Sequence, residues 1–110
     1  MILMKRIIRN ITSEKRYRGK FDKSIHSKFK KIARKHNRSV SWYLNMKLDE
    51  LKNNIEPKKY NTGEDYITKL VFLTKENHKF VKRESYLKGI AMRDYIQSVM
   101  EEVIRINETS

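Results

Sequence analysis

A short stretch of the chain alternates between polar and apolar residues with a period of two, which is typical of a half-buried β-strand. In Lys15–Phe21, the aromatic residues Tyr17 and Phe21 fall on one face together with Gly19, which marks a bulge or a close backbone approach. The opposite face carries three cations, Arg16, Arg18 and Lys20. The pattern therefore predicts a strand with an apolar inner face and a basic outer face.

The residues that follow have the periodicity of helices. Asp22 is a helix-capping residue, and apolar residues recur after it at i, i+4, i+7 and i+8: Ile25, Phe29, Ile32 and Ala33. Asn37 tolerates the left-handed backbone that ends many helices, and Ser39 can cap the next helix. That second helix is apolar on several sides, so we expect it to be buried through Trp42, Tyr43, Leu44, Met46, Leu48 and Leu51.

The same arrangement returns 52 residues later, where Asp22–Leu51 aligns with Thr74–Val103 and a capping residue again comes first. Tyr66–Leu73 predicts a second strand, and Gly89 ends the helix that follows. The residues of that helix expected to point inward are Phe80, Val81 and Leu87. A last helix, Met92–Ile106, carries a broad apolar face made by Tyr95, Ile96, Val99, Met100, Val103 and Ile104.

Two segments lack these patterns. Lys52–Asp65 contains the only proline, Pro57, has no periodicity and predicts a linker. Residues 1–14 form a basic arm in which apolar residues recur at roughly helical spacing: Leu3, Ile7, Ile8 and Ile11. Four roles remain open for this arm: packing on its own domain, gripping DNA, meeting a partner, or touching a membrane. The membrane is the least favoured, because the apolar stripe is short and lacks Trp and Phe.

Charge is distributed unevenly along the 110 residues. Residues 1–60 hold 18 Lys and Arg against 5 Asp and Glu, a net charge of +13, whereas residues 61–110 hold 8 of each kind. Concentrated like charge opposes compaction unless a polyanion neutralises it, so nucleic acid is the favoured partner. An anionic membrane, an acidic protein and a merely solvated face are the alternatives. No apolar run approaches the roughly 18 residues of a spanning helix, and the absence of cysteine fits a reducing compartment, so we expect a cytoplasmic protein.

A lone strand has two unpaired edges, so the two strands are expected to pair antiparallel above the four helices. This arrangement resembles the ribbon-helix-helix family, to which the Arc and MetJ repressors belong. The residues that carry the resemblance are Lys20-Phe21-Asp22, Ile25, Phe29, Ile32-Ala33, Asn37-Arg38-Ser39-Val40-Ser41 and Tyr43-Leu44, then Leu73-Thr74, Gly89-Ile90-Ala91-Met92, Asp94-Tyr95-Ile96 and Met100.

The resemblance implies a mainly α fold with a two-stranded antiparallel β-ribbon, in which two tandem ribbon-helix-helix units form an intramolecular pseudo-dimer. The domain covers residues 15–106, with repeat one at 15–51, the linker at 52–65 and repeat two at 66–106. A tandem chain of this kind is similar to TraY-type conjugation proteins, which bind near a plasmid transfer origin.

In this family the ribbon enters the DNA major groove, and its outward side chains read base edges. The resemblance therefore implies base contacts from Arg16, Arg18 and Lys20 in repeat one, and by the same parity from Thr68, Leu70 and Phe72 in repeat two. It also implies phosphate contacts, centred on the N-terminus of each second helix, from Lys15, Lys23, Arg38, Ser39, Val40, Ile90 and Ala91. In repeat one these contacts would use the free backbone N–H groups of Arg38, Ser39 and Val40, together with the helix dipole.

Repeat two departs from the family pattern. Its outward Leu and Phe hydrogen-bond poorly with bases, although either suits a thymine methyl group; the arm or another molecule is the alternative cover for this side. Ala91 replaces the capping Ser39, and Glu84 stands where repeat one has the core residue Ile32. We therefore expect asymmetric recognition that is dominated by repeat one.

The chemistry of an enzyme is not visible in the chain. His26 and His78 are repeat equivalents, which indicates a shared surface role, and no nucleophile–base pairing, Gly-rich phosphate loop or metal-ligand spacing is present. We expect no enzymatic activity, cofactor, metal or small-molecule ligand.

The favoured function is sequence-selective binding of double-stranded DNA, as an accessory protein for plasmid or conjugative-element transfer or partition. Further copies of the chain on DNA, or a relaxase or partition protein, are the expected additional partners. A transcriptional repressor that binds an operator is the first alternative, and an antitoxin-like interaction module is the second. RNA binding is disfavoured, because the aromatic residues fall in core phase and offer no stacking platform.

Overall fold

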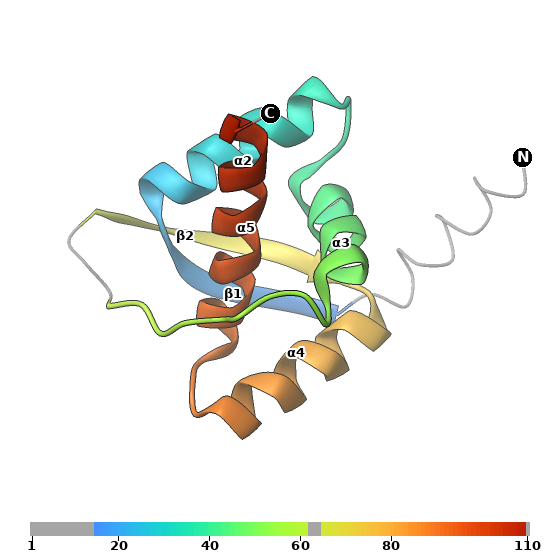
Figure 1. Ribbon diagram of the computed structural model, residues 1–110, viewed down its shortest axis with the longest axis vertical. Helices are drawn as coiled ribbons and strands as arrows, with labels where there is room; N and C mark the ends of the chain where they lie inside the picture. Colours follow the sequence, from blue (N-terminus) through green and yellow to red (C-terminus); the bar gives the residue numbers. More distant parts are fainter. Residues whose placement is uncertain (1–14, 62–64, 110) are drawn as a thin grey trace, which may run out of the picture.

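The computed structural model describes residues 15–61 and 65–109, so the predicted arm at 1–14 lies outside the described residues. The described chain is mainly helical with one two-stranded antiparallel sheet, and a strand followed by two helices occurs twice (Figure 1). The elements are β1 (Lys15–Asp22), α2 (Lys23–Lys35), α3 (Val40–Leu51), β2 (Tyr66–Leu73), α4 (Lys75–Lys88) and α5 (Met92–Thr109). These bounds agree with the predicted ones, except that β1 includes Asp22 and α5 continues past Ile106 to Thr109.

The two strands pair along their whole length. Lys15 lies opposite Leu73 and Asp22 opposite Tyr66, while α5 crosses in front of both strands in Figure 1. Each helix packs against one of the strands, and burial alternates along both strands, so the ribbon has an inner face toward the helices and an outer face. On the inner face the ring of Tyr17 lies over Gly19, where an added Cβ would come within 2.6 Å of Cε2. Gly19 thus marks a close approach to its backbone, and the group that approaches is the side chain of Tyr17, not another stretch of backbone.

The predicted helix boundaries form through local hydrogen bonds. Asp22 and Thr74 each accept the backbone N–H of the residue three positions on, at 2.9 and 3.1 Å, and Ser39 does the same for α3 at 3.1 Å. Caps of this kind each contribute about 1 kcal/mol. Asn37 and Gly89 have left-handed backbone with φ of 57° and 67°, as the repeat predicts.

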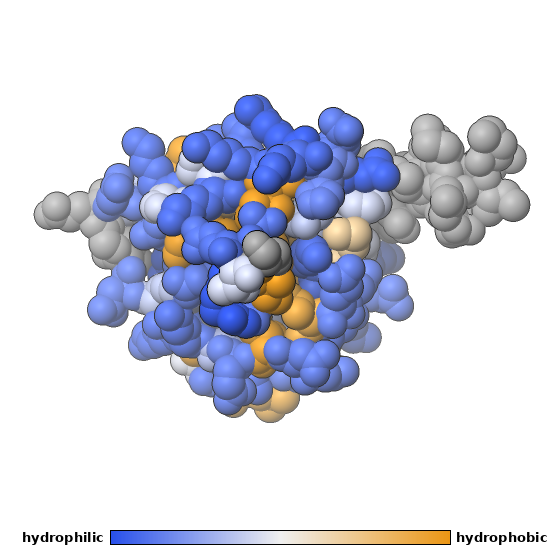
Figure 2. All heavy atoms as spheres, turned by 45° about the horizontal axis from the view of Figure 1, so that its top comes forward, coloured by the Kyte–Doolittle hydropathy of each residue, from blue (hydrophilic) through white to orange (hydrophobic). Residues whose placement is uncertain are grey.

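The core lies between the inner face of the ribbon and the helices, with its largest contribution from α5. Its buried apolar residues are Phe21, Phe29, Ile32, Ala33, Tyr43, Leu44, Leu48, Val71, Leu73, Val81, Tyr95, Ile96, Val99, Met100, Val103 and Ile104. The side of the molecule that carries the C-terminal end of α5 is mostly hydrophilic, with hydrophobic side chains visible in a narrow central strip (Figure 2).

The prediction that Leu87 points into the core is wrong. Leu87 is 68% exposed, because α4 turns Asn77, Val81 and Ser85 inward at i, i+4 and i+8. Leu87 comes two residues after Ser85 and therefore lies on the other side of the helix. Two of the three inward positions of α4 are polar, so a search for apolar periodicity selects the wrong face.

Two buried amides join each half of the chain to the other. Asn45 of α3 accepts the N–H of Thr74 through Oδ1 at 3.0 Å, and Gln97 of α5 accepts the N–H of Asp22 through Oε1 at 2.7 Å. Asn45 and Gln97 are 52 residues apart, as are Asp22 and Thr74. Each second helix thus binds the residue that caps the first helix of the other half.

The expected surface role of His26 is wrong, because its side chain is buried. His26 is 6% exposed, and its ring centroid lies 6.0 Å from that of Phe21. Burial lowers the pKa of His26, and the positive charges of Lys69 and Lys30 lower it further. Burial also lowers the pKa of the equivalent residue His78.

We expect the free energy of unfolding to fall as the pH drops below about 6.5, the pKa of an unperturbed histidine. Below that pH the unfolded chain binds more protons than the folded one, so this part of the stability is complete above the unfolded pKa and is lost as the pH falls through the folded pKa. Urea unfolding of the wild type and of His26→Gln at about pH 7.5 and about pH 5.5 measures the loss, which should be smaller in the variant. Equal losses in the two proteins would contradict this prediction.

Candidate nucleic-acid interface

The outer face of the ribbon brings together the six residues predicted to contact bases. The strand register places Arg16 opposite Phe72, Arg18 opposite Leu70 and Lys20 opposite Thr68. All six side chains are exposed, with Leu70 at 39% and Phe72 at 37%. Because directly opposed residues on one face lie about 5 Å apart at Cβ, these six side chains form one continuous surface.

This surface is cationic along β1 and largely apolar along β2, and none of the six residues is acidic. Sequence reasoning missed a seventh member, Tyr66, which is 41% exposed. The ammonium of Lys20 lies 4.9 Å from the centroid of the Tyr66 ring. The alternation that selects Thr68 also selects Tyr66, two residues earlier on the same face, so the signal was present in the strand pattern.

The N-terminus of α3 lies at one end of this face. Ser41, in the first turn of α3, accepts the backbone N–H of Phe72 through Oγ at 2.9 Å. Among the described residues, no acceptor binds the backbone N–H groups of Ser39 and Val40, so this end of the helix keeps free donors and the positive end of its dipole.

The prediction that the backbone N–H of Arg38 is free to bind an anion is wrong. Its backbone N–H is not free, because it donates to the carbonyl oxygen of Ala33 at 3.0 Å. Its guanidinium lies over the indole of Trp42, with Cζ 4.3 Å from the ring centroid. The guanidinium, and not the backbone, is therefore the group that Arg38 offers to an anion.

The N-terminus of α5 lies at the other end of the ribbon but is already occupied. Arg93 donates from Nη1 to the carbonyl oxygen of Lys20 at 2.9 Å, which fixes this helix end beside β1. The N–H of Ile90 donates to the carbonyl of Ser85, and the N–H of Ala91 donates to Oδ2 of Asp94, both at 3.0 Å. The two predicted phosphate-binding N–H groups of repeat two are thus engaged inside the protein.

A buried carboxylate takes the place of an external anion at this end. Asp94 is 2% exposed, and its Oδ1 also accepts the backbone N–H of Tyr60 at 3.0 Å and Nε of Arg93 at 3.1 Å. A negative charge at a helix N-terminus is favourable, and a second anion there would be repelled. The two helix ends that border the ribbon therefore differ in their ability to bind phosphate.

The remaining predicted phosphate contacts lie at the two ends of β1. Lys15 begins the strand and Lys23 follows it at the start of α2, and both are exposed. The backbone N–H of Lys23 donates to the carbonyl of Asp65 at 3.1 Å, so only the side chain is available. The rest of α2 adds further cations and no acidic residue: Lys28, Lys30, Lys31, Arg34 and Lys35.

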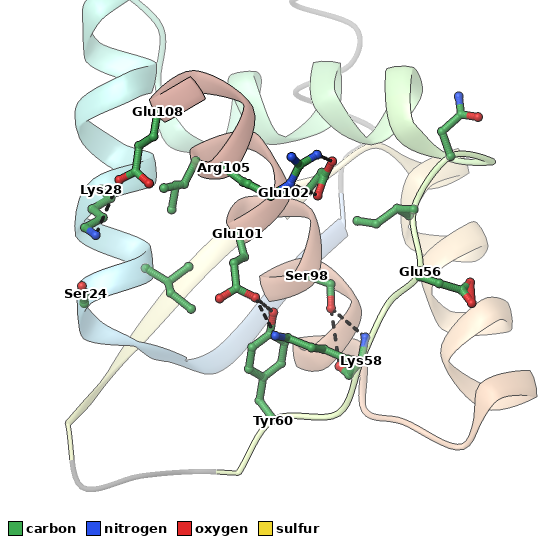
Figure 3. A pocket seen from close by; sticks show the side chains of 14 residues that line it. Ser24, Lys28, Glu56, Lys58, Tyr60, Ser98, Glu101, Glu102, Arg105 and Glu108 are labelled. Carbon is green, nitrogen blue, oxygen red and sulfur yellow. Dashed lines mark hydrogen bonds and ion pairs between the residues drawn. The ribbon is translucent and has the colours of Figure 1, made fainter. Parts of the chain in front are cut away.

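A separate groove of about 540 Å³ lies between α2, α5 and the linker (Figure 3). Three of the four carboxylates that line it are engaged by neighbouring groups: Glu101 by Tyr60 and Lys58, Glu102 by Arg105, and Glu108 by Lys28. Burial and the hydrogen bond to Glu101 raise the pKa of Tyr60 well above its usual value.

Two kinds of site are absent from residues 15–61 and 65–109. No group of three or more His, Cys, Asp or Glu side chains could hold a metal ion there. None of the helices in these two ranges combines the length with the apolar character that a bilayer crossing requires.

Comparison with protein-family models, with curated proteins and with solved structures finds no match to this chain.

Proposed function

We propose that this protein binds double-stranded DNA in a sequence-selective manner by inserting the outer face of the ribbon into the major groove. The observation that carries the proposal is the row formed by Arg16, Arg18 and Lys20, exposed on a two-stranded ribbon with a free helix N-terminus at one end. The major groove admits a two-stranded ribbon, and Arg pairs with both O6 and N7 of guanine. No enzymatic step belongs to this proposal.

We propose further that the two halves are tandem ribbon-helix-helix units that form an intramolecular pseudo-dimer. The register pairs Arg18 with Leu70, which is its own equivalent 52 residues later, so a local two-fold axis would pass between them. The same axis would relate the hydrogen bond that Asn45 accepts from Thr74 to the one that Gln97 accepts from Asp22. A single strand-helix-helix unit would leave its strand edge and these amides without partners.

The same axis makes recognition asymmetric. It relates Arg16 to Thr68 and Lys20 to Phe72, so each cation of β1 has an uncharged counterpart on β2. The end of the ribbon at α3 keeps free N–H donors for a phosphate, whereas the end at α5 holds the carboxylate of Asp94. The proposed DNA site is therefore asymmetric, with guanines under β1 and thymine methyl groups under Leu70 and Phe72.

The role we favour is that of an accessory protein in plasmid or conjugative-element transfer or partition, with further copies or a relaxase or partition protein beside it on DNA. Repression of a promoter is the alternative use of the same surface, and an antitoxin-like interaction module is the second alternative. Sequencing of the fragments that the protein retains from its source genome separates the first two, because a transfer or partition origin supports the first and a promoter supports the second.

We expect the affinity for duplex DNA to fall steeply with salt, with a log–log slope of magnitude about 4 or more, since each phosphate contact releases roughly 0.9 counterions from B-DNA. The groups expected to contact phosphates are the exposed cations of β1 and the N-terminus of α3 at the end of the ribbon. Fluorescence anisotropy with a labelled duplex at about 50 to 200 mM salt measures the slope. A flat dependence would exclude phosphate contacts as the main source of affinity and would favour a protein partner.

A further inference from the structure

The linker is bound along the outside of α5 by a set of polar contacts. The backbone N–H of Lys58 donates to Oγ of Ser98, and that of Tyr60 donates to Oδ1 of Asp94, both at 3.0 Å. The hydroxyl of Tyr60 donates to Glu101, and the ammonium of Lys58 lies 3.2 Å from the same carboxylate (Figure 3). The linker thus has a defined position on α5 before the chain enters β2.

The equivalent surface of α3 has the opposite chemistry. A shift of 52 residues converts Asp94, Ser98 and Glu101 of α5 into Trp42, Met46 and Asp49 of α3. Asp94 and Ser98 are buried, whereas Trp42 and Met46 are half-buried and Asp49 is exposed. One face of α3 therefore carries a tryptophan and a methionine that pack against the core and stay partly exposed, where α5 presents polar groups to the linker.

The segment that precedes β1 corresponds to the linker position by position. Residues 53–66 become residues 1–14 under the same shift, so the arm leads into β1 as the linker leads into β2. The shift turns Ile55 into Leu3, Lys58 into Arg6 and Tyr60 into Ile8. The polar linker thus has an apolar counterpart, and the polar face of α5 has an apolar counterpart on α3.

We propose that residues 1–14 bind along α3 over Trp42 and Met46, in the position that the linker takes on α5. Leu3 and Ile8 would cover these two side chains, and Arg6 would meet Asp49 as Lys58 meets Glu101. The distance poses no obstacle, because Ile8 precedes β1 by seven residues and Tyr60 precedes β2 by six. The proposal does not depend on DNA binding.

Docking of the arm would place a cation beside the free end of α3. Under the 52-residue shift, Arg9 is the equivalent of Asn61, which directly follows Tyr60. The carbonyl oxygen of Tyr60 accepts a hydrogen bond at 3.2 Å from Arg93, which lies in the first turn of α5. Arg9 would therefore lie near the first turn of α3, the end of the ribbon where the backbone N–H groups of Ser39 and Val40 are free.

Trp42 is the only tryptophan of the chain, so its fluorescence reports directly on this surface. In the full chain without DNA, Leu3→Asp/Ile8→Asp should shift the emission to longer wavelength and raise the acrylamide quenching constant. Asn10→Asp/Thr12→Asp, which adds the same charge to polar positions of the arm, should change neither. Unchanged emission and quenching in Leu3→Asp/Ile8→Asp would overturn the proposal.

A disulfide test gives independent evidence, because the chain contains no cysteine. Under mild oxidation, Arg6→Cys/Asp49→Cys should form a disulfide within one molecule, seen as a monomer with no free thiol. Arg6→Cys/Lys35→Cys, whose second cysteine lies on α2, should keep its thiols. Disulfide-linked dimers of the first variant would assign the arm to a second copy, and free thiols would leave α3 without the arm; either result overturns the proposal.

Discussion

Replacement of Arg18 by alanine is expected to weaken binding to the specific DNA site by about 1–3 kcal/mol, or roughly 5- to 150-fold in Kd, because one bidentate Arg–guanine contact contributes this much discrimination. Arg18 is the central residue of β1 and lies opposite Leu70 on the outer face. Binding to a random duplex should weaken much less, because that binding depends on charge. Titration of both duplexes with wild type and variant at one salt concentration gives the two ratios.

Arg34→Ala is the matched control for this prediction. Arg34 is an exposed arginine of α2, outside the ribbon, so its removal takes away the same charge without a base contact. We expect Arg34→Ala to weaken specific and random duplexes by similar factors. Base readout by β1 would be contradicted if Arg18→Ala also weakened both duplexes by the same factor.

Replacement of Asn45 by alanine is expected to destabilise the fold by on the order of 2–4 kcal/mol, because each buried polar group left without a partner costs about 1–3 kcal/mol. Asn45 donates to the carbonyl of Phe72 at 2.8 Å and accepts from the N–H of Thr74 and from Nδ2 of Asn77, both at 3.0 Å. These contacts join α3 to β2 and α4, so the loss should appear in global unfolding.

Urea unfolding followed by circular dichroism measures this loss. Asn107→Ala supplies the control, because Asn107 is an exposed asparagine of α5, and its stability should stay within about 0.5 kcal/mol of wild type. An equally small loss in Asn45→Ala would contradict the role assigned to the buried amide.

Local patterns predicted the elements of this fold because local interactions determine them. The period-two alternation in β1, the caps at Asp22 and Thr74 and the left-handed residues Asn37 and Gly89 act over a few residues each. Asn45 was not predictable in this way, because its partners outside α3 lie at least 27 residues away along the chain. A polar residue within an apolar helix has no sequence signal for the partner that it will meet.

The outer face of the ribbon was predictable for the same reason, since alternation alone separates it from the inner face. The difference in phosphate binding between the N-termini of α3 and α5 was harder to predict from the sequence. Asp94 comes three residues after Ala91, a spacing at which an acidic side chain commonly caps the helix start from within, so this signal was present in the sequence. The contact of Asp94 with Tyr60 depends on the path of the linker, which no local pattern determines.

Selection of bound duplexes from a random library shows whether the outer face of the ribbon reads DNA sequence, when three proteins are compared. Wild type should enrich one asymmetric sequence motif, and Arg16→Gln/Arg18→Gln/Lys20→Gln should enrich none. Lys31→Gln/Arg34→Gln/Lys35→Gln, which removes the same charge from α2, should enrich the wild-type motif with lower affinity. Sequence readout by the ribbon would be contradicted if wild type enriched no motif, or if the ribbon variant enriched the same motif as wild type.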